Sequence, residues 1–306
     1  MEPELIQHLR NSLASSPRLR IGLGDDAAIL HWHDREDLVV TTDLISDEID
    51  FLLAEVDPRR VGRKALAVNL SDLAAMGAEP IAAVVSLLLP KRPPQGTTLE
   101  LATKLYEGML PLCEQFDCVV AGGDTNSWSG PLAISVTAFG SCGAAPPLLR
   151  SAAKPGDVLL VTGQLGGSIV GHHFDFTPRV NEARKLAVEG LAHAAMDISD
   201  GLLLDLSRML KESAVSAVVD LPAVPVSPAA AKLAESSGKT PLQHALSDGE
   251  DFELLFTASP EAAAKLASEG LLGTSVTVIG TLVAGEGIWA DHVGGKRLEP
   301  QGFLHQ

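Results

Sequence analysis

Aspartate recurs beside glycine and at the ends of predicted strands, and this recurrence is the main chemical feature of the sequence. Six segments share it: Gly24-Asp-Asp-Ala-Ala, Thr41-Thr-Asp, Asn69-Leu-Ser-Asp, Gly122-Gly-Asp-Thr-Asn, Met196-Asp-Ile-Ser-Asp-Gly and Ser247-Asp-Gly-Glu-Asp. Any one of them is an ordinary turn or cap sequence, because Asp and Gly favour both. Six together, most of them directly after an apolar strand or on an apolar helix, indicate a carboxylate-rich site.

Asp72 is the sharpest case, because it lies at helical spacing from Val61, Ala65 and Val68 and so shares their apolar stripe. A carboxylate there is costly unless it is paired or binds a metal ion. Two carboxylates ~4 Å apart repel by about 4 kcal/mol at an effective dielectric constant of 20. Divalent cations remove that repulsion, and all-oxygen ligands favour Mg²⁺ or Mn²⁺. The residues alone therefore predict a Mg²⁺-dependent enzyme that handles phosphate.

Several other enzyme classes are unlikely on motif grounds. The sequence contains no G-x-x-x-x-G-K-[ST], no H-E-x-x-H and no G-x-S-x-G. The segment Gly22-Leu-Gly-Asp-Asp-Ala fails the dinucleotide fingerprint at its last position. The sequence thus disfavours a P-loop kinase, a dinucleotide dehydrogenase and a serine hydrolase.

Composition and charge limit the classes of molecule that the protein is expected to bind. The 306 residues are 46% hydrophobic and 20% charged, which is enough to bury a sizeable core, and the formal net charge is −16. Such a charge repels nucleic acid and anionic membranes. No apolar run reaches the length of a membrane span, and the acidic N-terminus lacks the layout of a secretory signal, so we expect a cytoplasmic protein. The three cysteines, Cys113, Cys118 and Cys142, are expected to be buried, reduced thiols.

The elements that must position these residues alternate between short strands and longer helices, which predicts an α/β (α+β) fold with two mixed sheet-and-helix domains. In the first half, strands are expected at 27–32, 38–42, 81–89, 118–121 and 132–139, and helices at 59–76 and 97–116. In the second half, strands are expected at 158–162, 194–198, 216–220, 252–257 and 275–282, and helices at 181–192, 202–212, 227–236 and 260–269. The segment Cys142-Gly-Ala-Ala-Pro-Pro breaks both patterns, so the predicted domains are 1–143 and 144–306.

An ordered set of motifs along the whole chain resembles the thiamine-monophosphate kinase family of the aminoimidazole-ribonucleotide-synthetase-like ATP-binding superfamily. The motifs are Gly22-Leu-Gly-Asp-Asp-Ala-Ala, Thr41-Thr-Asp, Lys64-Ala-Leu-Ala-Val-Asn-Leu-Ser-Asp-Leu-Ala-Ala-Met-Gly-Ala, Gly122-Gly-Asp-Thr, Lys154-Pro-Gly-Asp, Asp197-Ile-Ser-Asp-Gly-Leu and Gly249-Glu-Asp-Phe-Glu-Leu. The resemblance implies phosphoryl transfer from ATP to thiamine phosphate, giving thiamine diphosphate. It also implies a homodimer formed by the N-terminal domains, with ATP and several Mg²⁺ ions near that interface.

The resemblance also implies roles for individual residues. The positions that match Mg²⁺ ligands are Asp26, Thr41, Thr42, Asp43, Asp72, Asp124, Asp197 and Asp200. The positions that match ATP contacts are Tyr106, Gly123, Asp124, Arg150 and Ser199, and those on the thiamine phosphate side are Asp50, Glu250 and Phe303. Among these, Asp43, Asp72, Asp124 and Asp200 are expected to carry catalysis. An acceptor phosphate with a second pKa near ~6 is already ionised at neutral pH, so no general base is required.

The chain departs from the family pattern at three places. Asp50 stands before Phe51 where the family usually has a histidine, Phe176-Thr-Pro-Arg-Val replaces R-P-x-P-R, and the aromatic-rich C-terminus is reduced to Gly302-Phe-Leu-His. The adjacent His172 and His173 are expected to form a surface pair. Two alternatives stay open: another ATP-using enzyme of the superfamily with a different acceptor, and a non-catalytic protein that binds metal and nucleotide.

Overall fold

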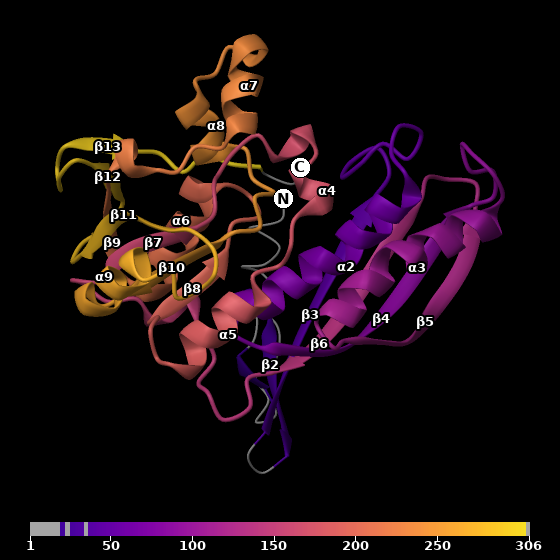
Figure 1. Ribbon diagram of the computed structural model, residues 1–306, viewed down its shortest axis with the longest axis horizontal. Coiled ribbons are helices and arrows are strands. Elements are labelled where there is room, and N and C mark those ends of the chain that lie inside the picture. Colours follow the sequence, from indigo (N-terminus) through magenta and orange to yellow (C-terminus); the bar gives the residue numbers. More distant parts are fainter. Residues whose placement is uncertain (1–18, 22–24, 34–35, 304–306) are drawn as a thin grey trace.

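Two mixed sheets follow one another along the chain, each with helices packed on it (Figure 1). The computed structural model describes residues 19–21, 25–33 and 36–303. Within these ranges no helix combines the length and the apolar character needed to span a membrane. The predicted α/β class with two sheet-and-helix units is confirmed.

The first sheet has six strands in the order β1-β2-β3-β6-β4-β5. Their bounds are Leu19–Ile21 (β1), Ala28–His33 (β2), Glu36–Ser46 (β3), Glu79–Pro90 (β4), Val119–Trp128 (β5) and Ala133–Ser141 (β6). Only the β4–β5 pair is parallel among the described pairings of this sheet. The helices α2 (Pro58–Ala75) and α3 (Thr98–Gln115) pack on one face of the sheet (Figure 1).

Local sequence explains where these two helices begin. The Asp57 side chain accepts a hydrogen bond from the Arg59 N–H, with Pro58 in the first helical position. The second helix starts with a capping box between Thr97 and Glu100. The apolar residues of α2 surround almost its whole circumference, so the helix is buried between the first sheet and the second half of the chain.

The second sheet has seven strands in the order β13-β12-β9-β11-β7-β10-β8. Their bounds are Val158–Thr162 (β7), Ala194–Asp197 (β8), Ser216–Val219 (β9), Leu254–Ala258 (β10), Val276–Val283 (β11), Ile288–Ala290 (β12) and Lys296–Leu298 (β13). The helices of this half are α4 (His172–Asp175), α5 (Val180–Val188), α6 (Leu202–Ser213), α7 (Pro228–Ser237), α8 (Pro241–Ser247) and α9 (Pro260–Ser268). The sheets lie side by side, with α2 and α5 between them (Figure 1).

The predicted elements are found close to their expected bounds, with two kinds of difference. The strand expected at 118–121 continues to Trp128, because pairing with β4 holds the glycine and polar residues of Gly122-Gly-Asp-Thr in an extended conformation. The first sheet has six strands where about five were expected, because the short strand β1 was not predicted. The sequence analysis missed β1, β12, β13 and α4, which have three or four residues each and are too short to show a period, and also α8.

The hydrophobic core runs from the first sheet into the second half of the chain. Leu66, Leu70 and Leu73 of α2 share one cluster of buried side chains with Leu186 of α5 and Phe256 of β10. All three cysteines are buried and unpaired, as predicted. The two sheets are separated by residues 142–157, and the domain boundary after residue 143 stays a prediction.

Candidate active site

Three aspartates from distant parts of the sequence meet where the two halves of the molecule join. Asp26 precedes β2, Asp72 lies on α2 and Asp197 ends β8. Each offers one carboxylate oxygen, and these three atoms lie within 4.8 Å of one another. The sequence placed all three among the candidate metal ligands, and the fold brings them together.

Neighbouring side chains orient these carboxylates. The Thr41 hydroxyl donates to Asp72 Oδ2 at 2.5 Å, and the Ser71 hydroxyl donates to Asp197 Oδ2 at 2.6 Å. Arg150 donates from Nε and Nη2 to the two oxygens of Asp26, each at 2.7 Å. The Ser71 bond was not anticipated, although this residue directly precedes Asp72 and lies on the same buried helix.

Burial and mutual repulsion dominate the electrostatics of the cluster. Burial raises the pKa of Asp72 well above its usual value, and the charges of Asp43, Asp197 and Asp26 raise it further. Burial, followed by the charge of Asp26, likewise raises the pKa of Asp197. Carboxylates with raised pKa values attract protons or cations, so the cluster is suited to bind positive charge.

Asp43 adds an unsatisfied acceptor beside this cluster. It lies on β3 and faces α2, and its Oδ2 atom is buried without a hydrogen-bond partner. Burial, followed by the charge of Asp50, raises the pKa of Asp43 to about 6. A buried carboxylate oxygen with no donor is unusual in a folded protein. The three clustered aspartates form an all-oxygen donor set of the kind that a hard divalent cation prefers, and the charge of Asp43 acts on Asp72 from close by.

The fold does not bring every predicted ligand into this cluster. The Thr42 side chain lies on the opposite face of β3, where its hydroxyl donates to the Val136 carbonyl oxygen at 3.0 Å. Asp124 is exposed on β5. Gly123 precedes it at a point where a Cβ atom would lie 1.8 Å from the Val85 carbonyl oxygen, so only glycine fits there.

The turn after β8 holds the remaining predicted ligands and is shaped by a residue that sequence analysis missed. Asp205 Oδ2 accepts the backbone N–H groups of Ser199, Asp200 and Gly201 at 2.9 to 3.1 Å. Arg208 forms ion pairs with both Asp200 and Asp205. The position of Asp205 in the first turn of α6, eight residues after Asp197, is the signal that could have found it.

Glu250 lies in a second polar cluster, formed with Lys64 and His173. Lys64 Nζ donates to Glu250 Oε1 at 2.5 Å, and His173 Nδ1 lies 3.0 Å from Glu250 Oε2. The expectation that His172 and His173 form a surface pair is wrong for His173, which is buried, whereas His172 is exposed. The one-turn helix α4 turns the two adjacent histidines in different directions, which a sequence without periodicity there could not indicate.

The other predicted ligand contacts come from three separate segments of the chain. The Asp50 carboxylate accepts the Ser46 N–H at 2.7 Å and so closes its own turn. Tyr106 is half-buried against the core on α3. The side chain of Phe303 is exposed, and its backbone N–H donates to the Asp200 carbonyl oxygen at 2.9 Å, which holds the C-terminal segment beside the turn after β8.

The altered segment around Phe176 is held by contacts of its own. Asp175 pairs with Arg60 of α2, and the Phe176 ring stacks on Phe252 with centroids 4.2 Å apart. Arg179 forms two hydrogen bonds with Glu253 at 2.7 and 2.6 Å. The departure from the family pattern therefore leaves this segment packed against both α2 and the loop that contains Glu250.

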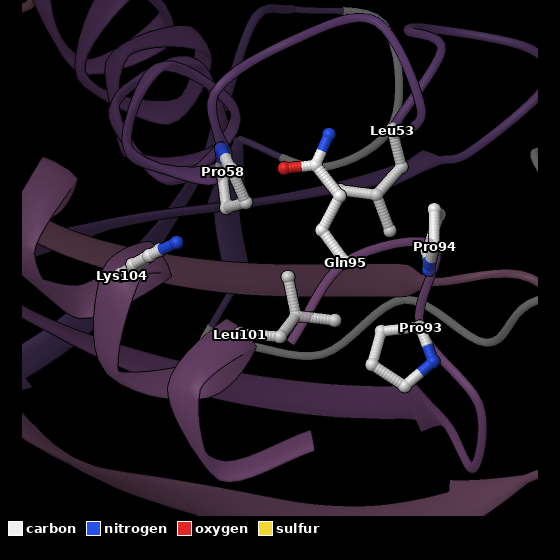
Figure 2. Close-up of a pocket in the computed structure, with 7 residues that line it drawn as sticks. All are labelled: Leu53, Pro58, Pro93, Pro94, Gln95, Leu101 and Lys104. Carbon is white, nitrogen blue, oxygen red and sulfur yellow. The ribbon is translucent and has the colours of Figure 1, made fainter. Parts of the chain in front are cut away.

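A small pocket lies apart from both clusters, between the loops that precede α2 and α3 (Figure 2). Its lining residues are Leu53, Pro58, Pro93, Pro94, Gln95, Leu101 and Lys104. None of the predicted site residues lines it, so it adds nothing to the carboxylate site.

Comparison with known proteins agrees with this fold. The chain matches the model of the AIR synthase related protein N-terminal domain over residues 24–142, and that of the C-terminal domain over residues 154–291. It is thus an AIR synthase related protein. A thiamine-monophosphate kinase of Rhodopirellula baltica is 44% identical over 100% of this chain and 97% of its own length. The chain belongs to the thiamine-monophosphate kinase family.

A second relative is also a thiamine-monophosphate kinase. A thiamine-monophosphate kinase of Salmonella typhimurium is 36% identical over 86% of this chain and 84% of its own. The solved structure of AaThiL complexed with AMPPCP and TMP superposes with a TM-score of 0.86 at 30% identity, covering 100% of this chain and 97% of that one. The likeness therefore extends over both sheets and not over one domain alone.

Proposed function

We propose that this protein transfers the γ-phosphoryl group of ATP to the phosphate of thiamine monophosphate, giving thiamine diphosphate and ADP. The observation that carries the proposal is the 44% identity with a thiamine-monophosphate kinase along essentially the full length of both chains. The AaThiL complex, which contains AMPPCP and TMP in a chain of the same fold, supports the choice of ATP and thiamine monophosphate as the two substrates.

The carboxylates fit a Mg²⁺ site. Asp26, Asp43, Asp72 and Asp197 would hold the ions, and the buried, unpartnered Oδ2 of Asp43 supports this assignment. Thr41, Thr42, Asp124 and Asp200 are proposed as further ligands from their motif positions. Bound Mg²⁺ would neutralise charge on the phosphate groups during transfer.

The protein's own residues then have to position two anions rather than activate a nucleophile. The acceptor phosphate is already ionised near neutral pH, so the transfer requires no general base, and the carboxylates can serve as metal ligands. The Thr41 and Ser71 hydroxyls orient the Asp72 and Asp197 carboxylates, and Arg150 brings a fixed positive charge to Asp26. Catalysis by alignment and charge neutralisation is the usual mode of phosphoryl transfer.

The two substrates are assigned to two different sets of residues. Tyr106, Gly123, Asp124, Arg150 and Ser199 are proposed for ATP, and Asp50, Glu250 and Phe303 for thiamine monophosphate. The ionised Glu250 suits the cationic thiazolium ring: burial opposes its charge, but the hydrogen bond from His173 and the charge of Lys64 keep its pKa below the usual value.

We further propose that the protein is a homodimer formed by the uncovered face of the first sheet. Thr42 and Leu44 of β3 point away from α2, and the Leu44 side chain is 67% exposed. The ten-residue edge strand β5 is exposed along almost its whole length, and long exposed edges are commonly covered by a partner.

A coupled ADP assay tests the proposed function, with thiamine monophosphate, unphosphorylated thiamine and an aminoimidazole ribonucleotide precursor as acceptors. We expect ADP release to depend on thiamine monophosphate and on Mg²⁺ or Mn²⁺, and to stop with excess chelator. Asp72→Asn is expected to remove most turnover, on the order of 10²-fold or more, because it exchanges a proposed metal ligand for a neutral amide. Release with another acceptor but not with thiamine monophosphate would overturn the proposal.

A further inference from the structure

The cluster of Lys64, His173 and Glu250 contains two buried side chains, Lys64 and His173, to which the proposed phosphoryl transfer assigns no contact with a substrate. Lys64 is a charged side chain on a buried helix, and only 1% of it is exposed. His173 is 4% exposed, whereas the Glu250 side chain is 33% exposed. The carboxylate therefore forms the outer edge of the cluster, and its two partners lie behind it.

The three side chains of this cluster come from three different elements. Lys64 comes from α2, His173 from α4 and Glu250 from the loop before β10. Lys64 Nζ also donates to the carbonyl oxygen of Asp50 at 3.0 Å, and it lies 2.9 Å from His173 Nδ1. The lysine thus ties the loop after β3, where the family histidine is absent, to the loop that contains Glu250.

Buried lysines are rare, and one that is fully paired has a structural or functional reason. Lys64 donates to Oε1, and His173 Nδ1 lies within hydrogen-bond distance of both Oε2 and the Lys64 ammonium group. As the Nδ1–H tautomer His173 donates to Oε2, and as the Nε2–H tautomer it accepts from Lys64 and holds the lysine in place. In either tautomer the pair restrains the rotation of the carboxylate. Because the ammonium group is on the buried side and the carboxylate is on the exposed side, the pair is a dipole whose negative end faces outward.

We propose that Lys64 and His173 are positioning residues that hold the Glu250 carboxylate towards the cationic ring of the acceptor. This inference rests on the proposed function, because it takes Glu250 to contact thiamine monophosphate. It adds a device built across both halves of the chain, in which a buried lysine and a histidine of α4 act on the acceptor through Glu250 without touching it.

The test is a double-mutant cycle in steady-state kinetics of the full-length protein. Lys64→Met and Glu250→Gln are each expected to raise KM for thiamine monophosphate by roughly 10-fold, the effect of losing one hydrogen bond to a charged group. KM for ATP should stay within about twofold. In the Glu250→Gln background, Lys64→Met should change KM for the acceptor by less than about twofold, because coupled residues are not additive.

Two further variants separate positioning from simple support of the fold. His173→Asn keeps an N–H donor near the place of Nδ1 and should retain most acceptor affinity, whereas His173→Leu should lose it as Lys64→Met does. The matched control is Arg59→Met, which breaks the exposed Arg59–Glu107 pair on the same helix, away from α4, and should leave KM for the acceptor unchanged. If Lys64→Met does not fold, the two His173 variants replace it in the double-mutant cycle. Each is then made in the wild-type background and in the Glu250→Gln background.

The possible outcomes separate a failure of the positioning role from a failure of the proposed function. A wild-type protein without thiamine monophosphate-dependent ADP release contradicts the proposed function. An active wild type overturns the positioning role in any of three cases: the Lys64 and Glu250 effects are additive, both KM values rise together, or Arg59→Met raises KM for the acceptor as much as Lys64→Met.

Discussion

Clustered carboxylates at the junction of the two halves cost folding free energy when no cation is present. Burial is the first reason, and mutual repulsion is the second, which is why the pKa values of Asp72 and Asp197 are raised. In the same region, burial and then the charge of Asp26 raise the pKa of Asp25 to about 7. A raised folded-state pKa means that the folded protein binds protons more tightly than the unfolded chain, so stability is lost as pH rises through that pKa.

The metal-free protein should therefore be more stable at pH 5.5 than at pH 8. The window follows from the pKa values of about 6 for Asp43 and about 7 for Asp25, both above the ordinary value of 3.8. A tenfold change in a proton affinity corresponds to roughly 1.4 kcal/mol, so the fall in the free energy of unfolding should be on the order of 1 to 3 kcal/mol. Chemical denaturation in chelator at both pH values measures it.

Mg²⁺ and Asp72→Asn provide the controls for this pH effect. Mg²⁺ should raise stability more at pH 8 than at pH 5.5, because protons compete for the same carboxylates. Asp72→Asn should flatten the metal-free pH profile. A metal-free protein whose stability rises between pH 5.5 and pH 8 would show that the carboxylates are not protonated in the folded state.

Asp205 is a second residue whose effect can be predicted from its contacts. It is fully buried and accepts three backbone N–H groups of the turn that holds Asp197 and Asp200. Asp205→Ala leaves these donors unsatisfied, and should cost about 2 to 4 kcal/mol of stability and weaken Mg²⁺ binding. Urea unfolding and a Mg²⁺ titration measure the two effects.

The matched control for Asp205→Ala is Ser207→Ala, two residues further along α6. The Ser207 hydroxyl donates only to the Leu204 carbonyl of its own helix, so this variant should change stability by less than about 1 kcal/mol and leave Mg²⁺ binding unaltered. Equal Mg²⁺ affinity in wild type and Asp205→Ala would mean that the turn keeps its shape without Asp205.

Sequence patterns predicted the role of residues whose environment depends on nearby positions in the chain. They did not predict the role of residues whose partners are brought together only by the tertiary fold. The apolar spacing around Asp72 predicted a carboxylate on the packed side of its helix, where Asp72 is half-buried, and the family resemblance implied Asp26 and Asp197 as metal ligands like it. The pairing of Lys64 with Glu250 joins positions 186 residues apart, which no local pattern encodes. The burial of His173 was missed for the same reason.

At the level of elements, long periodic helices were easier to predict than short strands. The helix expected at 59–76 is found at Pro58–Ala75, because an apolar surface, a cap and a proline all act locally. The end of β5 was misjudged since Gly122 and Gly123 are typical of turns, and only the neighbouring β4 strand holds them in the sheet. Tertiary pairing overrides local preference in such cases.

The packing of α2 against α3 gives a prediction at this scale. A Cβ atom at Gly62 would lie 1.9 Å from the Leu105 carbonyl oxygen, and one at Gly108 would lie 1.8 Å from that of Arg59. In an isolated helix, Gly→Ala gains up to about 1 kcal/mol. Here the backbone clash should dominate. Gly108→Ala should lower the free energy of unfolding by about 1 to 3 kcal/mol, the usual range for overpacking, and in some cases by more. Thermal and urea unfolding measure this change.

The control is Thr103→Ala on the exposed side of α3, which should change stability by less than about 1 kcal/mol. Because Gly62 and Gly108 lie at the same helix contact, the double substitution should cost less than the sum of the two single ones. A stabilised Gly108→Ala protein would mean that the helices can separate without loss of packing.

At the scale of the whole molecule, α2 joins the two halves. Along one stripe of this helix, Arg60 pairs with Asp175, Lys64 with Glu250 and Ser71 with Asp197. All three partners lie after residue 150, so the carboxylate cluster and the Glu250 cluster depend on one interface. The proposed sites for metal and acceptor are thereby fixed relative to each other by a single rigid element, which suits a reaction that requires two phosphates to be aligned.

The uncovered face of the first sheet leads to a prediction about assembly. Leu44 is 67% exposed at the centre of this face, and a charge placed there would be buried without a partner in the proposed dimer. We expect the wild type to sediment as a dimer and Leu44→Glu as a monomer with an unchanged circular dichroism spectrum. Activity should fall with the dimer, since the resemblance to the family implies that ATP binds near the interface of the N-terminal domains.

Val188→Glu is the matched control for this variant, because Val188 is also exposed, at 58%, but lies on α5 in the second half of the chain. It should leave both the dimer and the activity intact. Sedimentation velocity across the concentration range of the assay, with ADP release measured on the same samples, relates assembly to turnover. A wild-type protein that is monomeric and fully active throughout this range, or a Leu44→Glu protein that stays dimeric, would exclude this face as the interface.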